Sequence, residues 1–175
     1  MLKRKRTPGW LVMLWLLLIQ GGAMFGSEEL LVNGGFENRD QGWKKICHFR
    51  PGGTVETSSD EAHSGDYSLF FKNTTGVREH YYELFSQRLE KLEPGATYIL
   101  AFWGKGEISG KNRFGVCDDA YGNKGTVYAE VGSSDEWMRY EIRFKPDENG
   151  QKNIILMSRD LIEGFYIDDL SVTEE

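Results

Sequence analysis

The sequence predicts an all-β protein: an antiparallel β-sandwich or jelly roll, preceded by a signal peptide. No segment after residue 27 shows sustained helical periodicity, and short stretches of alternating apolar and polar residues recur instead. Gly, Asn, Asp and Ser separate these stretches, and the chain holds 21 Gly against 4 Pro. About ten short strands separated by turns are typical of a sandwich, and 175 residues suffice for one such domain.

Residues 1–26 have the pattern of a signal peptide with a short leader. Four basic residues at positions 3–6 precede an apolar run of ten residues at 10–19, and small residues follow up to Ala23. We expect cleavage near Ala23, with Gly26 as an alternative. The apolar run is about half of the ~20 residues that span a bilayer, so we expect no stable membrane insertion after cleavage. The mature domain, residues 28–175, is then secreted, extracellular or part of the cell envelope.

Two of the candidate strands have the clearest patterns. In residues 137–144, "WMRYEIRF", every second residue from Met138 to Phe144 is apolar, as expected for a half-buried antiparallel strand. Residues 96–105 are apolar on both faces and follow a Pro94-Gly95 turn, which indicates a central strand. The other predicted strands are residues 29–32, 42–49, 53–58, 66–72, 80–89, 113–117, 125–131, 153–158 and 164–172.

The last predicted strand contains two adjacent acidic residues, Asp168 and Asp169. Side chains alternate between the two faces of a strand, so one of these carboxylates shares a face with apolar neighbours. A buried carboxylate is costly unless it is paired, hydrogen-bonded or bound to a metal. The sequence therefore predicts a specific partner for one of the two acids.

The chain is acidic. It carries 21 basic and 27 acidic residues, a net charge of −6, and removal of the four basic residues of the signal peptide leaves 17 against 27, or −10. Such a domain has no positive surface that would attract nucleic acid or anionic lipid. Neutral or cationic partners and a divalent cation are compatible with this charge.

Cys47 and Cys117 are the two cysteines of the chain. Export makes a disulfide chemically possible. A closed loop of 70 residues would stabilise the fold by roughly 4 kcal/mol in the chain-entropy model. Two separate buried thiols are equally consistent with the sequence, because the sequence does not give the distance between them.

The order of several short motifs resembles the carbohydrate-binding modules of families 4, 9 and 22, which have a galactose-binding-like jelly-roll fold. The matching segments cover nearly all of the mature chain; they are residues 30–37 ("LLVNGGFE"), 42–43 ("GW"), 56–69, 85–105, 136–144 and 165–172. The resemblance implies a non-catalytic module that binds a polysaccharide or glycan. It also implies a possible partnership with a separate glycan-active enzyme.

The resemblance further implies a structural calcium ion where the first and last strands meet. The positions that match its ligands are the Gly35 carbonyl, the Glu37 carboxylate, the backbone around Ser64 and Tyr67, and Asp168. Ca²⁺ takes roughly six to eight oxygen ligands, and glycine-containing turns can aim backbone carbonyls at such an ion. On this interpretation Asp168 points toward the ion, and Asp169 points outward or into a local hydrogen bond.

Two alternatives to this ligand set remain open. His63 or Asp66 can replace Ser64 and Tyr67, because the match there depends on the alignment around Gly65. Without a metal, Asp168 would accept backbone N–H groups at the end of its strand.

Sugar recognition needs flat apolar surfaces for pyranose rings and fixed polar groups for hydroxyls. By the resemblance, Tyr81 and Tyr121 lie near positions where related modules place ring-stacking aromatic residues; a packing role is equally consistent with each. Asn112, Arg113 and Arg159 are the predicted hydroxyl partners. The other aromatic residues of interest are expected to pack in the core; these are Trp43, Tyr82, Tyr98, Phe102 and Trp103.

The sequence does not favour catalysis. The adjacent acids at 118–119 and 168–169 face opposite ways in an extended chain, so neither pair forms a glycosidase site without partners from elsewhere. The three histidines have no metal-ligand spacing, and no hydrolase or nucleotide-binding motif is present. The main alternative is a cell-surface structural or adhesion domain that binds protein partners. A small glycoside hydrolase would require a cleft with two carboxylates from different strands.

Overall fold

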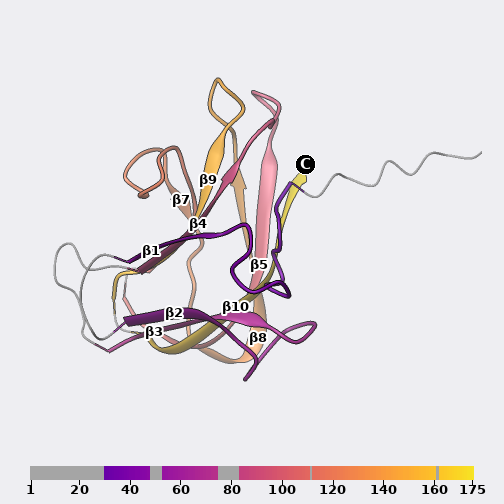
Figure 1. Cartoon of the computed structure of the whole chain (residues 1–175). Coiled ribbons are helices and arrows are strands. Elements are labelled where there is room, and N and C mark those ends of the chain that lie inside the picture. The colour runs from indigo at the N-terminus through magenta and orange to yellow at the C-terminus, as the bar shows by residue number, and fades with distance from the viewer. Residues whose placement is uncertain (1–29, 48–52, 75–82, 111, 161) are drawn as a thin grey trace, which may run out of the picture.

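The computed structural model describes residues 30–47, 53–74, 83–110, 112–160 and 162–175. This part of the chain contains ten strands and no helix, and every strand pairing is antiparallel (Figure 1). Sheet A contains, in spatial order, β1 (Lys44–Cys47), β4 (Glu83–Leu89), β9 (Lys152–Ser158), β6 (Arg113–Cys117) and β7 (Val127–Tyr128). Sheet B contains β2 (Gly53–Ser58), β3 (Ser68–Asn73), β10 (Ile162–Glu174), β5 (Tyr98–Ile108) and β8 (Ser134–Phe144). The predicted all-β sandwich is therefore confirmed.

The strand pattern of the sequence is recovered for ten of the eleven predicted segments. β2 and β6 have the predicted bounds, and β5 is central in sheet B, between β10 and β8. In β8 the apolar face is buried at Ile142 and Phe144, whereas Met138, near the other end, is 48% exposed. β7 is only two residues long, which is shorter than the predicted 125–131 segment.

The predicted strand at residues 29–32 is wrong for the residues that the structure describes, because residues 30–33 form no ladder with another strand. The Gln87 side chain takes the place of a neighbouring strand there. Its Oε1 accepts the Val32 N–H at 2.7 Å, and its Nε2 donates to the Val32 carbonyl at 2.9 Å. A side-chain amide can satisfy both backbone groups of one residue, so this segment docks without becoming a strand.

The core lies between the two sheets and is rich in phenylalanine. Phe114 of sheet A is fully buried and contacts three phenylalanines of sheet B, with ring centroids 5.3 Å from Phe71, 6.5 Å from Phe102 and 5.8 Å from Phe165. Trp43 packs against Phe36 and Phe85, with ring centroids 5.4 and 6.3 Å away, and is 8% exposed, as expected. These ring contacts hold the two sheets face to face.

No helix among the described residues is long and apolar enough to cross a membrane.

The remaining aromatic predictions have mixed outcomes. Tyr98 and Phe102 are buried, as expected. The prediction for Trp103 is wrong: it follows Phe102 in β5, so it faces away from the core, where it is half-buried and stacked on His63 at a centroid distance of 4.0 Å. Tyr82 lies outside the described residues.

The backbone register separates the two cysteines. β1 pairs Cys47 with Glu83, β4 pairs Glu83 with Ser158, and β9 pairs Asn153 with Cys117. The two cysteines are thus three strands apart and displaced by five residues along the sheet, which is too far for a disulfide. Cys117 is accordingly a free, buried thiol, and burial raises its pKa to about 12.

Candidate functional site

The first cluster of interest joins the two ends of the domain. It consists of Glu37, His63, Ser64, Asp168 and Asp169, and we call it the terminal junction. The ladder between β10 and β5 shifts register between Asp168 and Ser171, and Asp169 has a left-handed φ of 47°. This bulge breaks the alternation of side chains. Both acids therefore contact the turn at residues 63–64, but they differ in burial: Asp168 is fully buried, whereas the Asp169 side chain is 29% exposed.

Asp168 is fully buried and is held by backbone N–H groups. Its Oδ2 accepts from His63 N at 2.8 Å and from Ser64 N at 3.2 Å, and its Oδ1 accepts from Asp169 N at 2.7 Å. Loss of water on burial raises the pKa of Asp168 to about 6, against the opposing effect of these N–H donors. The question raised by the paired acids thus has a structural answer, because backbone donors surround the buried one.

Asp169 binds the side chains of the same turn. Its Oδ2 lies 2.6 Å from Nδ1 of His63, and its Oδ1 accepts from the Ser64 hydroxyl at 2.7 Å. The His63 ring is also stacked on Trp103. The sequence predicted an outward or locally bonded Asp169, but its partners are more than a hundred residues away in the chain.

Glu37 reaches the same loop from the other end of the chain. Its Oε1 accepts the N–H groups of Asp66 and Tyr67, both at 3.0 Å. Gly65 has a left-handed φ of 64°, and a Cβ built on it would lie 2.3 Å from Oε1 of Glu37. Glycine is therefore required at position 65 if Glu37 is to dock there.

The terminal junction has some of the chemistry that a calcium ion needs. Gly35 lies beside it, because a Cβ built on Gly35 would be 3.9 Å from Oδ1 of Asp168. Among the described residues, neither Glu37 nor Asp168 forms an ion pair with a cationic side chain, and both carboxylates are bonded by backbone N–H groups. The backbone at Ser64 and Tyr67 offers N–H groups to these carboxylates. No group of three or more His, Cys, Asp or Glu in this part of the chain is arranged to hold a metal, and calcium stays a prediction.

The second site is a cavity of about 940 Å³ at the end of sheet A where β6 begins and β9 ends; we call it the end pocket. Three of the predicted sugar-binding residues line it, together with an aromatic residue and two acids. The lining includes Asn112, Arg113, Tyr128, Glu130, Arg159 and Asp160. Side chains from separate segments thus converge on one cavity, as the predicted hydroxyl partners require.

Asn112 and Arg159 have different roles in the end pocket. Oδ1 of Asn112 accepts the N–H groups of Arg159 and Asp160 at 2.8 and 3.1 Å, and its Nδ2 donates to the Ser109 carbonyl at 2.8 Å. Its amide therefore holds the pocket wall together. Within the described residues the guanidinium of Arg159 has no hydrogen bond or ion pair, so its donors are available to a ligand.

Arg113 and Tyr128 hold the loop of residues 118–125 against the pocket. Nη1 of Arg113 and the hydroxyl of Tyr128 both donate to the Gly122 carbonyl at 3.0 Å. The Arg113 guanidinium also lies over the Tyr128 ring, 5.3 Å from its centroid. Tyr121, the neighbour of Gly122, is 46% exposed. The loop thus carries an exposed aromatic residue next to a residue that is bonded to the pocket wall.

The same loop covers the outer face of sheet A. A Cβ built on Gly122 would lie 3.4 Å from Cδ1 of Ile155 and 3.5 Å from Cε of Met157. Both side chains point away from the core, yet Ile155 is fully buried and Met157 is 2% exposed. The loop therefore fills the space over these two side chains, and the end pocket lies beyond it at the end of the sheet.

Sequence reasoning missed Tyr128, Glu130 and Asp160. The alternation of the 125–131 segment places Tyr128 and Glu130 on one face, but nothing in it indicates which face borders a cavity. Tyr81, the other predicted platform, lies outside the described residues.

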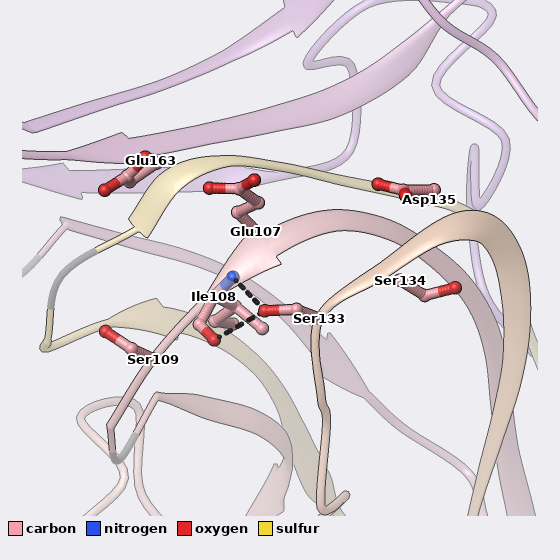
Figure 2. A pocket seen from close by; sticks show the side chains of 7 residues that line it. All are labelled: Glu107, Ile108, Ser109, Ser133, Ser134, Asp135 and Glu163. Carbon is pink, nitrogen blue, oxygen red and sulfur yellow. Dashed lines mark hydrogen bonds between the residues drawn. The ribbon is translucent and has the colours of Figure 1, made fainter.

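A third cavity, of about 400 Å³, contains acidic residues from three strands (Figure 2). In the view of Figure 2 the Glu107 side chain of β5 lies between Glu163 of β10 and Asp135 of β8. A hydrogen bond with the Glu163 carboxyl, and then the charge of that group, raise the pKa of Glu107. These carboxyls come from different strands, as the hydrolase alternative requires, but the three acidic side chains are exposed.

Comparison with known proteins gives a consistent result. The model of a family described as a carbohydrate binding domain matches residues 28–157. No curated protein sequence matches the chain. The structure of TmCBM61 in complex with β-1,4-galactotriose is 27% identical with a TM-score of 0.61, and the match covers 85% of this chain and all of that one.

Two other solved structures show the same fold at lower identity. The CBM22-1 xylan-binding domain of Xyn10C from Paenibacillus barcinonensis is 16% identical with a TM-score of 0.57, over 85% of this chain and 95% of that one. The enzymatically active domain of tailspike protein 4 from bacteriophage CBA120 is 15% identical with a TM-score of 0.63, over 84% of this chain. The chain spans only 21% of that tailspike domain.

Proposed function

The chain belongs to the carbohydrate binding domain family, and on that basis we propose that it binds a polysaccharide or glycan and leaves it chemically unchanged. One observation carries the choice of site. The end pocket brings Asn112, Arg113 and Arg159 together beside the loop that carries Tyr121. These four residues come from three separate segments, and the sequence predicts a sugar-binding role for each.

Binding combines ring stacking with hydrogen bonds in a preformed pocket. The exposed Tyr121 ring provides an apolar surface beside it. Arg159 provides hydrogen-bond donors, and the exposed Glu130 carboxylate provides acceptors for sugar hydroxyls. Hydroxyls exchange water partners for protein partners with little net gain, so we expect modest affinity for a single site.

A β-1,4-linked galactan is the first glycan to test. The structural relative at 27% identity is in complex with β-1,4-galactotriose. The xylan-binding relative is less similar, at 16% identity, and supports only the fold. Xylan is therefore the second candidate.

The test is affinity electrophoresis against soluble glucans, xylans, mannans and galactans. We expect galactan to retard the protein, and Tyr121→Ala to reduce the retardation without unfolding the domain. Tyr166→Ala provides a matched control, because Tyr166 is a partly buried tyrosine of sheet B that packs against Phe70 and does not line the end pocket. If no polysaccharide retards the wild-type protein, adhesion through protein partners becomes the better account.

A hydrolase is the weaker alternative. The cavity of Figure 2 does hold two carboxyls from different strands, Glu107 and Glu163, but both are exposed, and the family match of the chain is to a binding domain. A reducing-sugar assay on the polysaccharide that is retained checks this point. Release of sugar by the wild-type protein, and its loss in Glu107→Gln, would overturn the non-catalytic proposal.

Three further features belong to the same proposal. We propose a structural Ca²⁺ at the terminal junction, held by Gly35, Glu37 and Asp168 with backbone oxygens near Ser64 and Tyr67. Neither the Glu37 nor the Asp168 carboxylate has a cationic side-chain partner in the described part of the chain, and this supports the proposed ion. We also propose export through residues 1–26, which lie outside the described residues, and action alongside a separate glycan-active enzyme.

A further inference from the structure

The loop at residues 118–125 is held at its base and at its tip by hydrogen bonds and an ion pair. At its base the Asp118 carboxylate pairs with the Lys152 ammonium, and the Asp118 carbonyl accepts from Nδ2 of Asn153 at 3.1 Å. The Asp118 N–H donates to the Lys124 carbonyl at 2.9 Å, which closes the loop on itself. The first end of the loop is therefore fixed to β9, and the second end is fixed to the first.

The tip of the loop is organised by one carboxylate. Oδ1 of Asp119 accepts the N–H of Tyr121 at 2.7 Å and the N–H of Asn123 at 3.2 Å. Oδ2 of Asp119 also accepts the Asn123 N–H at 3.2 Å. These bonds restrain the backbone on both sides of Gly122, which has a left-handed φ of 72°.

The other side of the tip is restrained from the end pocket. Both Arg113 and Tyr128 donate to the Gly122 carbonyl, so the residue next to Tyr121 is bonded to the pocket wall. Tyr121 itself remains 46% exposed. A large aromatic ring left in water on a tightly restrained backbone gains little for folding, but it suits a surface that must meet a ligand in one orientation.

We propose that Asp119 is a positioning residue of the glycan site: its carboxylate fixes the backbone of Tyr121 and thereby limits the directions in which the Tyr121 ring can meet the sugar. This rests on the proposed function of the end pocket. Ordering the loop before binding removes an entropy cost that the ligand would otherwise meet. Asp119 acts through Tyr121 and needs no contact with the sugar.

The first measurement uses the free protein. In Asp119→Ala we expect the amides of Tyr121 and Asn123 to exchange with deuterium about tenfold faster or more, while the amides of β6 and β9 keep their protection. Asp119→Asn keeps one acceptor oxygen and should restore protection at Tyr121. Unchanged exchange at Tyr121 in Asp119→Ala would overturn the proposal whether or not a sugar binds.

The second measurement is a double-mutant cycle on soluble β-1,4-galactan, with xylan in parallel. The four proteins are wild type, Asp119→Ala, Tyr121→Ala and the double variant. We expect Asp119→Ala to weaken binding about three- to tenfold, the effect of disordering one segment, and to have no further effect once Tyr121 is alanine. An equal loss in both backgrounds would show that Asp119 acts by another route, and the proposal would be wrong.

The two proposals fail in different ways. If the wild-type protein binds neither polysaccharide, the function of the end pocket is refuted, and the role of Asp119 in recognition with it. If the wild type binds and Tyr121→Ala weakens binding, but Asp119→Ala does not, only the positioning role is refuted.

Discussion

The backbone N–H of His63 donates to Oδ2 of Asp168 at 2.8 Å, although the two residues are 105 positions apart in the chain. This bond ties a turn of the N-terminal half to the last strand. It belongs to the terminal junction, where Glu37 binds the same loop from the other side. The ends of the domain are thus joined through one short loop.

The buried Asp168 makes stability depend on pH in a definite direction. Its pKa in the folded protein is about 6, above the ordinary value of 3.8, so the folded state binds a proton more tightly than the unfolded chain does. The contribution of this group is fully present below about pH 3.8 and is lost as the pH rises through about 6. The full effect is on the order of 2–3 kcal/mol.

The check is urea unfolding of wild type and Asp168→Asn in EDTA, at several pH values between 4 and 7. Because the asparagine side chain of the variant does not titrate, the wild-type free energy of unfolding minus that of the variant should fall as the pH rises. A carbon-13 NMR titration of the Asp168 carboxyl should give a midpoint near 6. A midpoint below 4 would contradict the buried, desolvated environment.

Sequence patterns sufficed for the fold because sandwich strands follow simple alternation. The clear alternation of β8 and the turn before β5 appear in the structure where they were expected. Residues 30–32 were predicted to be a strand but form none, because the Gln87 side chain bonds the backbone of Val32 in place of a neighbouring strand. A pattern of apolar residues carries no information about such a tertiary contact.

The residues of the end pocket and of the terminal junction were predicted less completely, because tertiary contacts leave no pattern in the sequence. Arg159 and Tyr121 could be selected as polar-loop and aromatic candidates, but the role of Asp119 depends on which backbone groups its loop turns toward it. The bulge at Asp168 and Asp169 has no sequence signature, and it brings both acids to the same turn at residues 63–64. Register shifts and loop closures must be seen in three dimensions.

Gly65 tests whether docking of Glu37 stabilises the domain. Gly65→Ala places a Cβ 2.3 Å from Oε1 of Glu37, so the carboxylate must leave the N–H groups of Asp66 and Tyr67. We expect a loss of roughly 2–4 kcal/mol in the free energy of unfolding, from backbone strain and lost charge-assisted hydrogen bonds together.

Gly95→Ala is the matched control. Gly95 also has a positive φ, of 91°, but a Cβ there meets nothing within 4 Å. Its cost, roughly 1–2 kcal/mol, measures the backbone strain alone. If both variants lose the same amount in urea unfolding, Glu37 contributes nothing measurable at this position.

Calcium removal tests the proposed ion at the terminal junction. A ligand that binds only the folded state raises stability with its concentration, so EDTA should lower the melting temperature by several degrees and added Ca²⁺ should restore it. Glu37→Gln retains an acceptor oxygen for the loop N–H groups but removes the charge. It should therefore melt close to the EDTA-treated wild type and respond weakly to Ca²⁺. A wild-type melting curve that is the same in EDTA and in Ca²⁺, with metal-free protein, would refute the ion.

Arg159 is the most direct test of the end pocket. Its guanidinium has no partner among the described residues, so Arg159→Ala should change the free energy of unfolding by less than ~1 kcal/mol. A charged donor that bonds sugar hydroxyls contributes about 1.5–3 kcal/mol, so binding of the retained polysaccharide should weaken about tenfold or more.

Arg143→Ala separates this effect from a change in net charge. Arg143 is an arginine on the opposite sheet whose Nε pairs with Glu175 at 2.8 Å, outside the end pocket. Both variants remove one positive charge from an acidic domain, so any long-range electrostatic effect on the glycan is the same in each. A loss of binding confined to Arg159→Ala places the sugar at the end pocket, whereas equal behaviour of the two variants moves the site elsewhere on the molecule.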